Sequence, residues 1–421
     1  MTLEARSETL AFTALHDKAR EQLAVDGLKP RLFVAPATPE EAARALAQAH
    51  AERLATSVRG GGTRLGLGNP PRALDLVLST EKLNRVIAYE PADLTITVGA
   101  GIAFAELQRV LGERNQFLPL DPAAAPGSTI GGIVAANASG PFRLRYGSAR
   151  DLVIGTQVAN PTGGLARAGG RVVKNVTGYD LNKLYVGSLG TLAAITELTF
   201  KVTPKPEAEA TLVARFGDAA AAHAAAYRTL RSPLTPSALE LMPDEGGARL
   251  VAHLAGFARP LARMLDDLTR FATEAGASAV DRVEAGEAER LWRQLRDGPA
   301  VPEGGARLKI AVPISQVVWA IGAVEAAAKA NGLTATTYAG AGTGVLRASL
   351  GGGELLPAIR RLRAEAGEHL GSLVVEQCPL ALKQQFDVFG DLPDNFEVMR
   401  RLKNQMDPGG ILNPGRFLGR L

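Results

Sequence analysis

The sequence has few of the residues that form disulfides or bind metals. Its 421 residues include a single cysteine, Cys378, so neither an internal disulfide nor a cysteine-ligated iron–sulfur centre can form within the chain. The five histidines are dispersed along the sequence, and none lies at ligand spacing from another. We therefore expect no metal site, and a reducing compartment such as the cytoplasm.

Signals for export, membrane insertion and nucleic-acid binding are missing as well. Residues 1–20 carry charges throughout and lack the apolar core of a signal peptide, and no apolar run approaches the roughly 18 residues of a membrane span. The 47 Lys and Arg residues are mixed with 43 Asp and Glu residues, and only 5% of the chain is aromatic, which argues against a nucleic-acid partner. We expect a cytoplasmic protein that meets the inner face of a membrane only peripherally, through a partner.

Three common nucleotide-binding and catalytic motifs are also absent. No segment has the phosphate P-loop pattern or the Gly-x-Ser-x-Gly pattern of a hydrolase. The nearest approach to a dinucleotide fingerprint begins at Gly99, but Phe104 stands where a small residue must let helix and strand approach each other. NTP hydrolysis, nicotinamide binding and nucleophilic hydrolysis are therefore disfavoured.

The residues that are present indicate an α+β protein of two or three domains. Hydrophobic residues make up 46% and charged residues 21% of the chain, which is typical of a folded protein. Strand-like runs punctuated by glycine clusters extend to Lys205, after which strands alternate with long Ala-, Leu- and Arg-rich helices. We predict four segments, namely an N-terminal helix (1–27), a first domain (28–206), a second α+β domain (207–375) and a C-terminal segment (376–421).

Three consecutive glycines, Gly60, Gly61 and Gly62, stand between a predicted strand and a polar turn. Glycine loses more backbone entropy on folding than any other residue, so three in a row are costly. One interpretation is a loose surface loop. The other is a nest of backbone N–H groups that wraps an anion, with Arg59 and Arg64 favouring a pyrophosphate. The segment alone does not decide between them.

A second small-residue cluster spans residues 121–140 and alternates proline with glycine, serine and threonine. Little in it can fill a core, whereas residues this small allow the backbone to press against a flat ligand. A long loop without secondary structure inside a compact domain is uncommon unless it has a function. We therefore expect this segment to line a binding site.

The order of these motifs resembles the FAD-binding domain of the vanillyl-alcohol oxidase / p-cresol methylhydroxylase (PCMH-type) family, over about residues 28–206. The resemblance rests on Arg-Gly-Gly-Gly-Thr at 59–63, Pro-Gly-Ser-Thr-Ile-Gly-Gly at 126–132, Tyr-Gly at 146–147 and Gly-Ser-Leu-Gly-Thr-Leu at 187–192. The run 170–184 and the tail 399–417 are similar to the branch of glycolate and D-lactate dehydrogenase subunits. The resemblance implies a PCMH-type FAD-binding domain of two α+β subdomains, a second α+β cap or substrate domain, and a C-terminal segment that returns to the flavin domain.

The resemblance also implies FAD as the cofactor. Members that bond the flavin covalently usually have a histidine after the glycine turn, where this chain has Thr63 and Arg64, so the FAD is expected to be noncovalent. The residues that would bind it are Arg59, Gly60, Gly61, Gly62, Thr63, Arg64, Pro126, Gly127, Ser128, Thr129, Gly131, Gly132, Asn137, Gly140, Tyr146, Gly147, Ile195, Asn413 and Arg416.

The segments that resemble the family's catalytic region depart from its pattern. The catalytic relatives use a divalent metal with a Gly-His-x-Gly-Asp-Gly-Asn-Leu-His segment and a later Glu-His pair, whereas Gly340, Arg347 and Gln377 replace those histidines here. The remaining carboxylate, Glu376, cannot form a mixed nitrogen and oxygen metal site alone. Arg347 could pair with Glu376 or hold a carboxylate bidentately. Arg347, Glu376 and Tyr338 are the candidate catalytic residues.

The function that the resemblance implies is that of an FAD-binding subunit in a glycolate (2-hydroxy acid) dehydrogenase complex that oxidises glycolate to glyoxylate. Its partners would be a sister flavoprotein that retains the histidines and an iron–sulfur subunit, and its substrate a small 2-hydroxy acid. Two alternatives stay open at this point. One is a self-sufficient, metal-free FAD-dependent alcohol or hydroxy-acid dehydrogenase, and the other is a structural subunit with a flavin fold.

Overall fold

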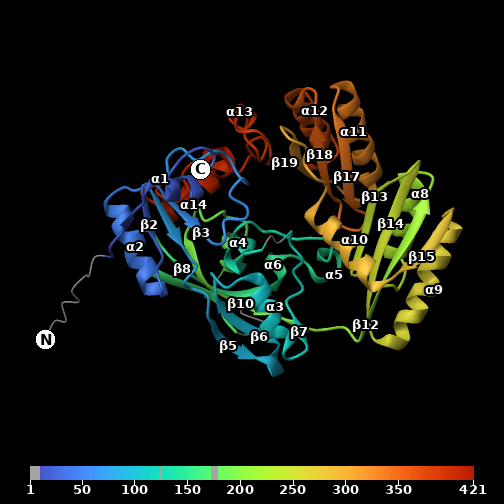
Figure 1. The fold of residues 1–421 in the computed structure, drawn as a ribbon, viewed down its shortest axis with the longest axis horizontal. Helices are drawn as coiled ribbons and strands as arrows, with labels where there is room; N and C mark the ends of the chain where they lie inside the picture. Colours follow the sequence, from blue (N-terminus) through green and yellow to red (C-terminus); the bar gives the residue numbers. More distant parts are fainter. Residues whose placement is uncertain (1–9, 124–125, 172–178) are drawn as a thin grey trace.

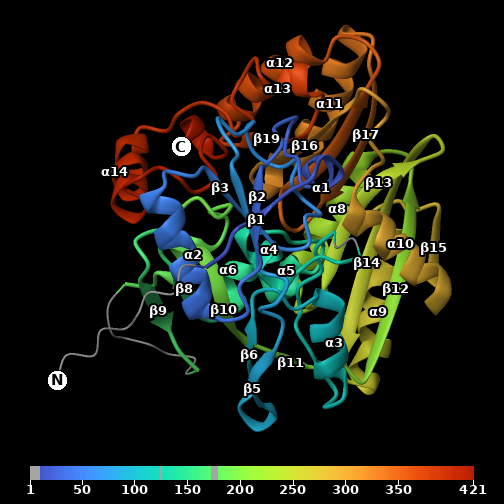
Figure 2. The same cartoon turned by 60° about the vertical axis from the view of Figure 1, so that its left-hand side comes forward.

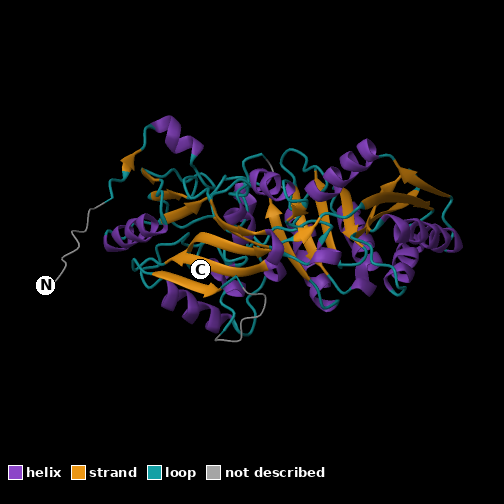
Figure 3. Ribbon diagram, turned by 90° about the horizontal axis from the view of Figure 1, so that it is seen from below, coloured by secondary structure: helices purple, strands orange, loops and turns teal. Residues whose placement is uncertain are grey.

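The computed structural model describes residues 10–123, 126–171 and 179–421, which form two halves lying side by side (Figure 1). One half contains the blue and green part of the chain together with the red C-terminal segment, and the other contains the yellow and orange part. Helices flank the strands in both halves (Figure 3). None of the helices in these ranges is long and apolar enough to cross a lipid bilayer.

The first half begins with a four-stranded sheet in the order β1-β2-β4-β3, whose strands β2, β4 and β3 run parallel. Helix α2 starts at Pro39, as the capping sequence predicts, because the Thr38 side chain accepts a hydrogen bond of 3.2 Å from the Glu41 N–H. The bounds are β1 (Thr13–Ala14), α1 (Asp17–Gln22), β2 (Leu32–Val34), α2 (Pro39–Ala51), β3 (Thr56–Arg59) and β4 (Leu76–Ser79).

A five-stranded antiparallel sheet, β5-β6-β10-β8-β9, completes the core of this half. One of its faces packs against α2, and the other packs against α3, α4 and α6. The bounds are β5 (Val86–Glu90), η1 (Pro91–Asp93), β6 (Thr95–Gly99), α3 (Phe104–Gly112), β7 (Gln116–Phe117), α4 (Ile130–Ala135), α5 (Arg143–Tyr146), α6 (Ala149–Leu152), β8 (Val153–Ala159), β9 (Leu165–Gly169), α7 (Asn182–Tyr185), β10 (Ala194–Lys201) and β11 (Thr203–Pro204), which pairs with β7.

The second half is an eight-stranded antiparallel sheet in the order β15-β12-β14-β13-β17-β18-β16-β19. Helices α8, α9, α11 and α12 bury one face of it in a large apolar core, while α10 covers only part of the other face. The bounds are β12 (Ala208–Phe216), α8 (Ala219–Leu230), β13 (Ala238–Asp244), β14 (Gly247–Gly256), α9 (Ala258–Glu274), β15 (Ala279–Val283), α10 (Ala285–Asp297), β16 (Ala306–Ala311), η2 (Ile314–Gln316), α11 (Val317–Ala330), β17 (Thr334–Gly340), β18 (Val345–Gly351), α12 (Leu355–Glu368) and β19 (Ser372–Gln377).

The C-terminal segment returns to the first half, as the sequence predicts. It holds α13 (Leu380–Lys383), α14 (Phe396–Met406) and η3 (Leu418–Arg420), and Figure 2 shows α14 on the side of the molecule that carries α2. The Thr56 N–H donates to the Ile411 carbonyl at 2.7 Å, and the Asn413 N–H donates to the Thr56 carbonyl at 2.9 Å. Beneath the tail, the buried Lys403 ammonium binds Asp407 at 2.6 Å.

The predicted N-terminal helix over 1–27 is wrong in its extent. Within residues 10–27, helix is confined to Asp17–Gln22, with the His16 ring as its N-cap, and β1 pairs with β2 before it. Asp26 and Gly27 both have positive φ, which a right-handed helix does not allow. Residues 1–9 of that prediction, and residues 172–178 of the run 170–184, lie outside the described residues.

Candidate active site

A pocket of about 920 Å³ lies in the first half, between the end of β3 and helix α4. Its walls come from the loop 59–67, the N-terminal end of α4, the segment 189–195 and the tail residues Asn413 and Arg416. These segments are distant in the sequence. They meet because the C-terminal tail returns to lie against β3.

The glycine turn forms one wall of this pocket. The N–H groups of residues 61–64 have no acceptor among the residues that the structure describes, and Gly62 has a φ of +69°. A Cβ atom at Gly60 would stand 2.0 Å from the Thr129 Oγ1, and one at Gly61 would stand 1.7 Å from the Gly127 carbonyl oxygen. The turn is therefore a closely packed row of free N–H donors, which suits an anion such as a pyrophosphate.

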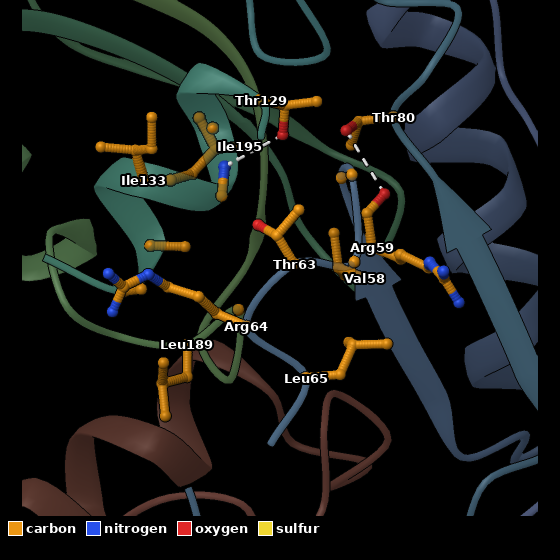
Figure 4. Close-up of a pocket in the computed structure, with 18 of the residues that line it drawn as sticks. Val58, Arg59, Thr63, Arg64, Leu65, Thr80, Thr129, Ile133, Leu189 and Ile195 are labelled. Carbon is orange, nitrogen blue, oxygen red and sulfur yellow. Dashed lines mark hydrogen bonds between the residues drawn. The ribbon is translucent and has the colours of Figure 1, made fainter. Parts of the chain in front are cut away.

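The opposite wall is the start of α4. Thr129 caps the helix by accepting a bond from the Gly132 N–H at 3.4 Å, and Ser128 Oγ lies 2.9 Å from Thr63 Oγ1 across the pocket. Helix α4 can lie this close to β6 because Gly131 has no side chain, since a Cβ there would stand 2.8 Å from Ala100 Cβ. Figure 4 marks the hydrogen bond at the Thr129 hydroxyl with a dashed line and shows Thr63 facing this end of α4.

Most of the predicted cofactor residues line this single pocket. They are Arg59, Gly60, Gly61, Gly62, Thr63, Arg64, Ser128, Thr129, Gly131, Gly132, Ile195, Asn413 and Arg416. The structure thus brings together the glycine turn, the Ser-Thr-Ile-Gly-Gly segment and the tail.

Three of these residues have side chains engaged elsewhere. In Figure 4 the Arg59 guanidinium points away from Thr63, and it donates to the Gln22 carbonyl at 3.2 Å. Arg416 binds Asp26 and the carbonyls of Leu65 and Leu67. Asn413 donates to the Leu189 carbonyl at 2.9 Å. Their side chains shape the pocket by holding its loops in place.

The other predicted cofactor residues surround the pocket without lining it. Gly127, which follows Pro126, supplies the carbonyl group that faces Gly61. Asn137 has a positive φ after α4, and its buried Oδ1 has no hydrogen-bond partner among the described residues. Gly140 packs on Asp121. Gly147, with a φ of +78°, ends α5 directly after Tyr146, whose ring contacts Phe117 and Phe142.

The uncovered face of the eight-stranded sheet lies against the first half, beside this pocket. Arg347 on β18 donates to the Ser139 carbonyl, and Arg145 on α5 donates to the Ala255 carbonyl at 2.6 Å. The rings of Phe142 and His253 pack in a tilted arrangement with centroids 4.7 Å apart. The segment between α4 and α6 therefore joins the pocket to the sheet.

A cluster of cations gathers where the two halves meet. Lys309 on β16 lies directly opposite Arg347, and Arg307 is two residues along the same strand and so on the same face. Arg64 and Arg143 approach from the first half, close enough to act electrostatically on Lys309. We call these five residues the cation cluster.

The cation cluster is half-buried and has few partners. Burial lowers the pKa of Arg64, and the charges of Arg347 and Arg307 lower it further, while Glu376 raises it. Burial also lowers the pKa of Lys309, which Glu376 again opposes. No salt bridge to a cluster member is found among the described residues, and each arginine donates to only one protein acceptor there. Half-buried cations with unused donors are suited to an anionic ligand.

Two buried carboxyl groups stand beside Arg347. Burial raises the pKa of Asp121 to about 7. The N–H groups of Phe142 and Gly140, which donate to its two oxygens at 2.8 and 3.0 Å, oppose this rise because they stabilise the carboxylate. Burial raises the pKa of Glu240, on β13, to about 8, although the positive charge of Arg347 lowers this pKa. The pKa values of both groups therefore lie near neutral pH.

The three candidate catalytic residues have different surroundings. Arg347 does not form an ion pair with Glu376, and its guanidinium reaches the first half instead. Glu376, on β19, lies near Arg64 and Lys309. The Tyr338 hydroxyl accepts a hydrogen bond of 2.7 Å from Gln294. The Tyr338 ring packs in the apolar cluster under α10, so its contacts are with that cluster and not with the cation cluster.

Sequence reasoning missed Asp121, Arg143, Glu240, Arg307 and Lys309 as site residues. One signal was available, because Arg307 and Lys309 alternate with buried apolar residues in the predicted strand near 308–312 and so mark its second face as polar. Asp121, Arg143 and Glu240 have no such signal. The order of strands in the sheet brings Glu240 to Arg347, and the contact between the halves brings Asp121 and Arg143 there.

Comparison with known families supports the cofactor. Residues 30–169 match the FAD binding domain family, and residues 390–417 match the C-terminal domain of FAD linked oxidases. The glycine turn, the α4 segment and the returning tail fall within these two matches, whereas the pocket segment 189–195 lies outside them. The free N–H groups of the turn fit the phosphates of FAD, so the chain has an FAD-binding domain.

Similar proteins cover nearly the whole chain. The glycolate oxidase subunit GlcD of Bacillus subtilis is 27% identical, covering 93% of this chain and 89% of that protein. The D-lactate dehydrogenase of Archaeoglobus fulgidus is also 27% identical, covering 93% and 92%. Among solved structures, p-cresol methylhydroxylase superposes with a TM-score of 0.70 at 18% identity, covering 92% and 89%, which shows a PCMH-type fold.

Proposed function

We propose that this chain, an FAD-linked oxidoreductase, is the FAD-binding subunit of a 2-hydroxy acid dehydrogenase complex that oxidises glycolate to glyoxylate. When bound, FAD supplies the acceptor for the two electrons that leave the CH–OH group of the substrate. The observation that carries the proposal is the cation cluster beside the FAD pocket. A small hydroxy acid brings a carboxylate, and no member of the cluster forms a salt bridge among the described residues.

The residues divide into two roles in this proposal. The glycine turn, Ser128 and Thr129 hold the cofactor phosphates, and the tail residue Asn413 fixes the loop across from them. Arg347 and Lys309, which lie opposite each other on neighbouring strands, hold the substrate carboxylate. Arg64, which lines the FAD pocket, belongs to the same cation cluster, so a substrate held there lies beside the pocket.

The partner subunits are part of the proposal. The chain has a single cysteine, so an iron–sulfur centre that passes electrons onward must belong to another subunit. A sister flavoprotein with the histidine pattern would be the second partner. The name of the similar GlcD protein, a glycolate oxidase subunit, supports a complex of several subunits. Contact with a membrane would occur through this complex.

One alternative has an observation of its own in its favour. The cation cluster and the two buried carboxyl groups could bind and deprotonate a hydroxy acid without a partner, as a self-sufficient dehydrogenase requires. An anaerobic titration of the purified chain with glycolate and then D-lactate, following the flavin absorbance, distinguishes the two. Bleaching by the chain alone favours the self-sufficient enzyme, and bleaching only after the sister subunit is added favours the complex.

We predict that the FAD is noncovalent, because Thr63 and Arg64 occupy the positions after the glycine turn and neither side chain forms a flavin linkage. Acid precipitation of the purified protein should leave the yellow colour in the supernatant. Colour that stays in the pellet would contradict this, and a colourless protein that cannot be reconstituted with FAD would favour a purely structural subunit.

A further inference from the structure

Glu240 occupies a central place on the sheet face that meets the FAD-binding half. It lies on β13 opposite Gly340 of β17, two residues from Tyr338, which in turn lies opposite Arg347 of β18. Because cross-strand partners and residues two apart share a face, Glu240, Arg347 and Lys309 all point toward the first half. Gly340 leaves room for the carboxyl group, since a Cβ there would stand 3.3 Å from Glu240 Oε1.

The Glu240 carboxyl group has no protein partner. Its side chain belongs to a residue that is only 7% exposed, and no hydrogen bond or ion pair to it is found among the described residues. Asp121, the other carboxyl group beside Arg347, uses both oxygens to bind the N–H groups of Gly140 and Phe142. Asp121 therefore has a structural task, whereas the polar atoms of Glu240 remain available to a ligand.

The surroundings of Glu240 keep its proton exchangeable near neutral pH. Burial raises its pKa to about 8, Arg347 lowers the pKa, and the Asp121 carboxylate raises it. The other ionisable groups on the elements packed against β13 are His253 and Arg249 on β14, Tyr338 on β17, Arg143, Arg145 and Tyr146 on α5, and His223, Tyr227 and Arg228 on α8, which covers the opposite face of the sheet. None of them forms a hydrogen bond with Glu240 in the described part of the chain.

We propose that Glu240 is the general base that takes the hydroxyl proton of the substrate, an inference that rests on the proposed function. In this step the O–H bond of the 2-hydroxy acid breaks and its proton passes to the Glu240 carboxylate. The hydrogen on the same carbon leaves with its bonding electrons to oxidised FAD, and a C=O bond forms. The products are a 2-oxo acid, reduced FAD and a protonated Glu240, so atoms and electrons balance.

The test compares the wild-type protein with Glu240→Gln, in the complete complex if the chain requires one. Glutamine resembles the protonated glutamic acid in shape, so the variant should fold and keep its FAD. We expect anaerobic flavin reduction by glycolate or D-lactate to slow by at least about 100-fold, the range of general base catalysis. The wild-type rate should rise with pH and level off above about 8, and the variant should lose this rise.

Two further measurements keep the result interpretable. Glu209→Gln, an exposed glutamate on β12 of the same sheet, is the matched control and should keep the wild-type rate and pH profile. Infrared difference spectra of the proteins should show a protonated carboxyl band at neutral pH that is missing only in Glu240→Gln. This readout is independent of turnover.

The outcomes separate the base from the function on which it rests. A Glu240→Gln protein with wild-type rate and pH profile, or with an unchanged carboxyl band, overturns the role of Glu240 while leaving the dehydrogenase intact. A wild-type complex whose flavin is bleached by no 2-hydroxy acid instead overturns the proposed function, and the Glu240 step with it.

Discussion

At Gly61, the absence of one methyl group keeps the cofactor pocket open. A Cβ there would stand 1.7 Å from the Gly127 carbonyl oxygen, so Gly61→Ala must push apart the two loops that face the phosphates. We expect the affinity for FAD to fall by about tenfold or more, which corresponds to about 1.4 kcal/mol. The FAD content of the purified protein and a reconstitution titration measure it. Gly66→Ala, in the same loop with open space around it, is the control and should bind FAD normally.

Arg347 is the residue through which a substrate carboxylate would be recognised. Replacing it by Met keeps much of the side-chain volume and removes the charge, and a charge-assisted hydrogen bond contributes about 1.5–3 kcal/mol. We therefore expect Arg347→Met to weaken glycolate binding about 10- to 150-fold with FAD content unchanged. Flavin reduction at increasing glycolate measures this. The exposed Arg282→Met on β15 is the control, and loss of folding in Arg347→Met alone would indicate a structural role.

At the scale of elements, a buried ion triad holds the C-terminal segment on the first half. The Lys383 ammonium of α13 binds both Asp26 oxygens at 2.9 and 3.0 Å, and Arg416 of the tail binds the same carboxylate at 3.2 Å. The three side chains are only 2%, 13% and 7% exposed for Lys383, Asp26 and Arg416. The triad fixes the loop 65–67, which forms one wall of the FAD pocket.

Asp26→Asn should therefore destabilise the protein and weaken FAD binding together. Breaking a buried pair by removing one partner costs about 3–5 kcal/mol, because the remaining cations stay buried without compensation. Urea denaturation of the apo and FAD-loaded forms measures both effects. Asp17→Asn, whose side chain is 99% exposed beside Arg20, is the control and should change neither quantity by much. Equal stability of the two variants would contradict the role of the triad.

At the scale of the whole molecule, the buried carboxyl groups between the halves make stability depend on pH. The Glu240 pKa is about 8 in the folded protein and about 4.3 in an unfolded chain. Between these values the folded state keeps a proton that the unfolded state has released, so the free energy of unfolding decreases as pH rises, and the decrease ends above about pH 8. Asp121, with a pKa of about 7, acts in the same direction.

Glu240→Gln should remove part of this dependence. We expect the variant and the wild type to be similar in stability near pH 4, and the variant to become the more stable of the two toward pH 8 and above. Thermal or urea unfolding across that range measures it. Parallel curves for the two proteins would show that Glu240 does not keep its proton in the folded state.

The helix starts and the cofactor-binding loops can be predicted from the sequence, because they depend on residues that are neighbours along the chain. Thr38 before Pro39 caps the start of α2, and α8, α11 and α12 lie in the part of the chain after Lys205 where the sequence predicts long Ala-, Leu- and Arg-rich helices. The glycine turn and the Pro-Gly-Ser-Thr-Ile-Gly-Gly segment indicated the FAD pocket, because free N–H groups and close approach require those residue types at those positions.

Which charges meet depends on how the strands and the two halves pack together. Glu240, Lys309, Arg347 and Glu376 lie on β13, β16, β18 and β19, and the order of these strands in the sheet differs from their order in the sequence. A strand pattern reveals which residues share a face but not which strand lies alongside. Asp121 enters the site only because the first half packs on that face. The cation cluster and Glu240 therefore come together through the order of the strands and the contact between the halves. Neither of these is a local property of the sequence.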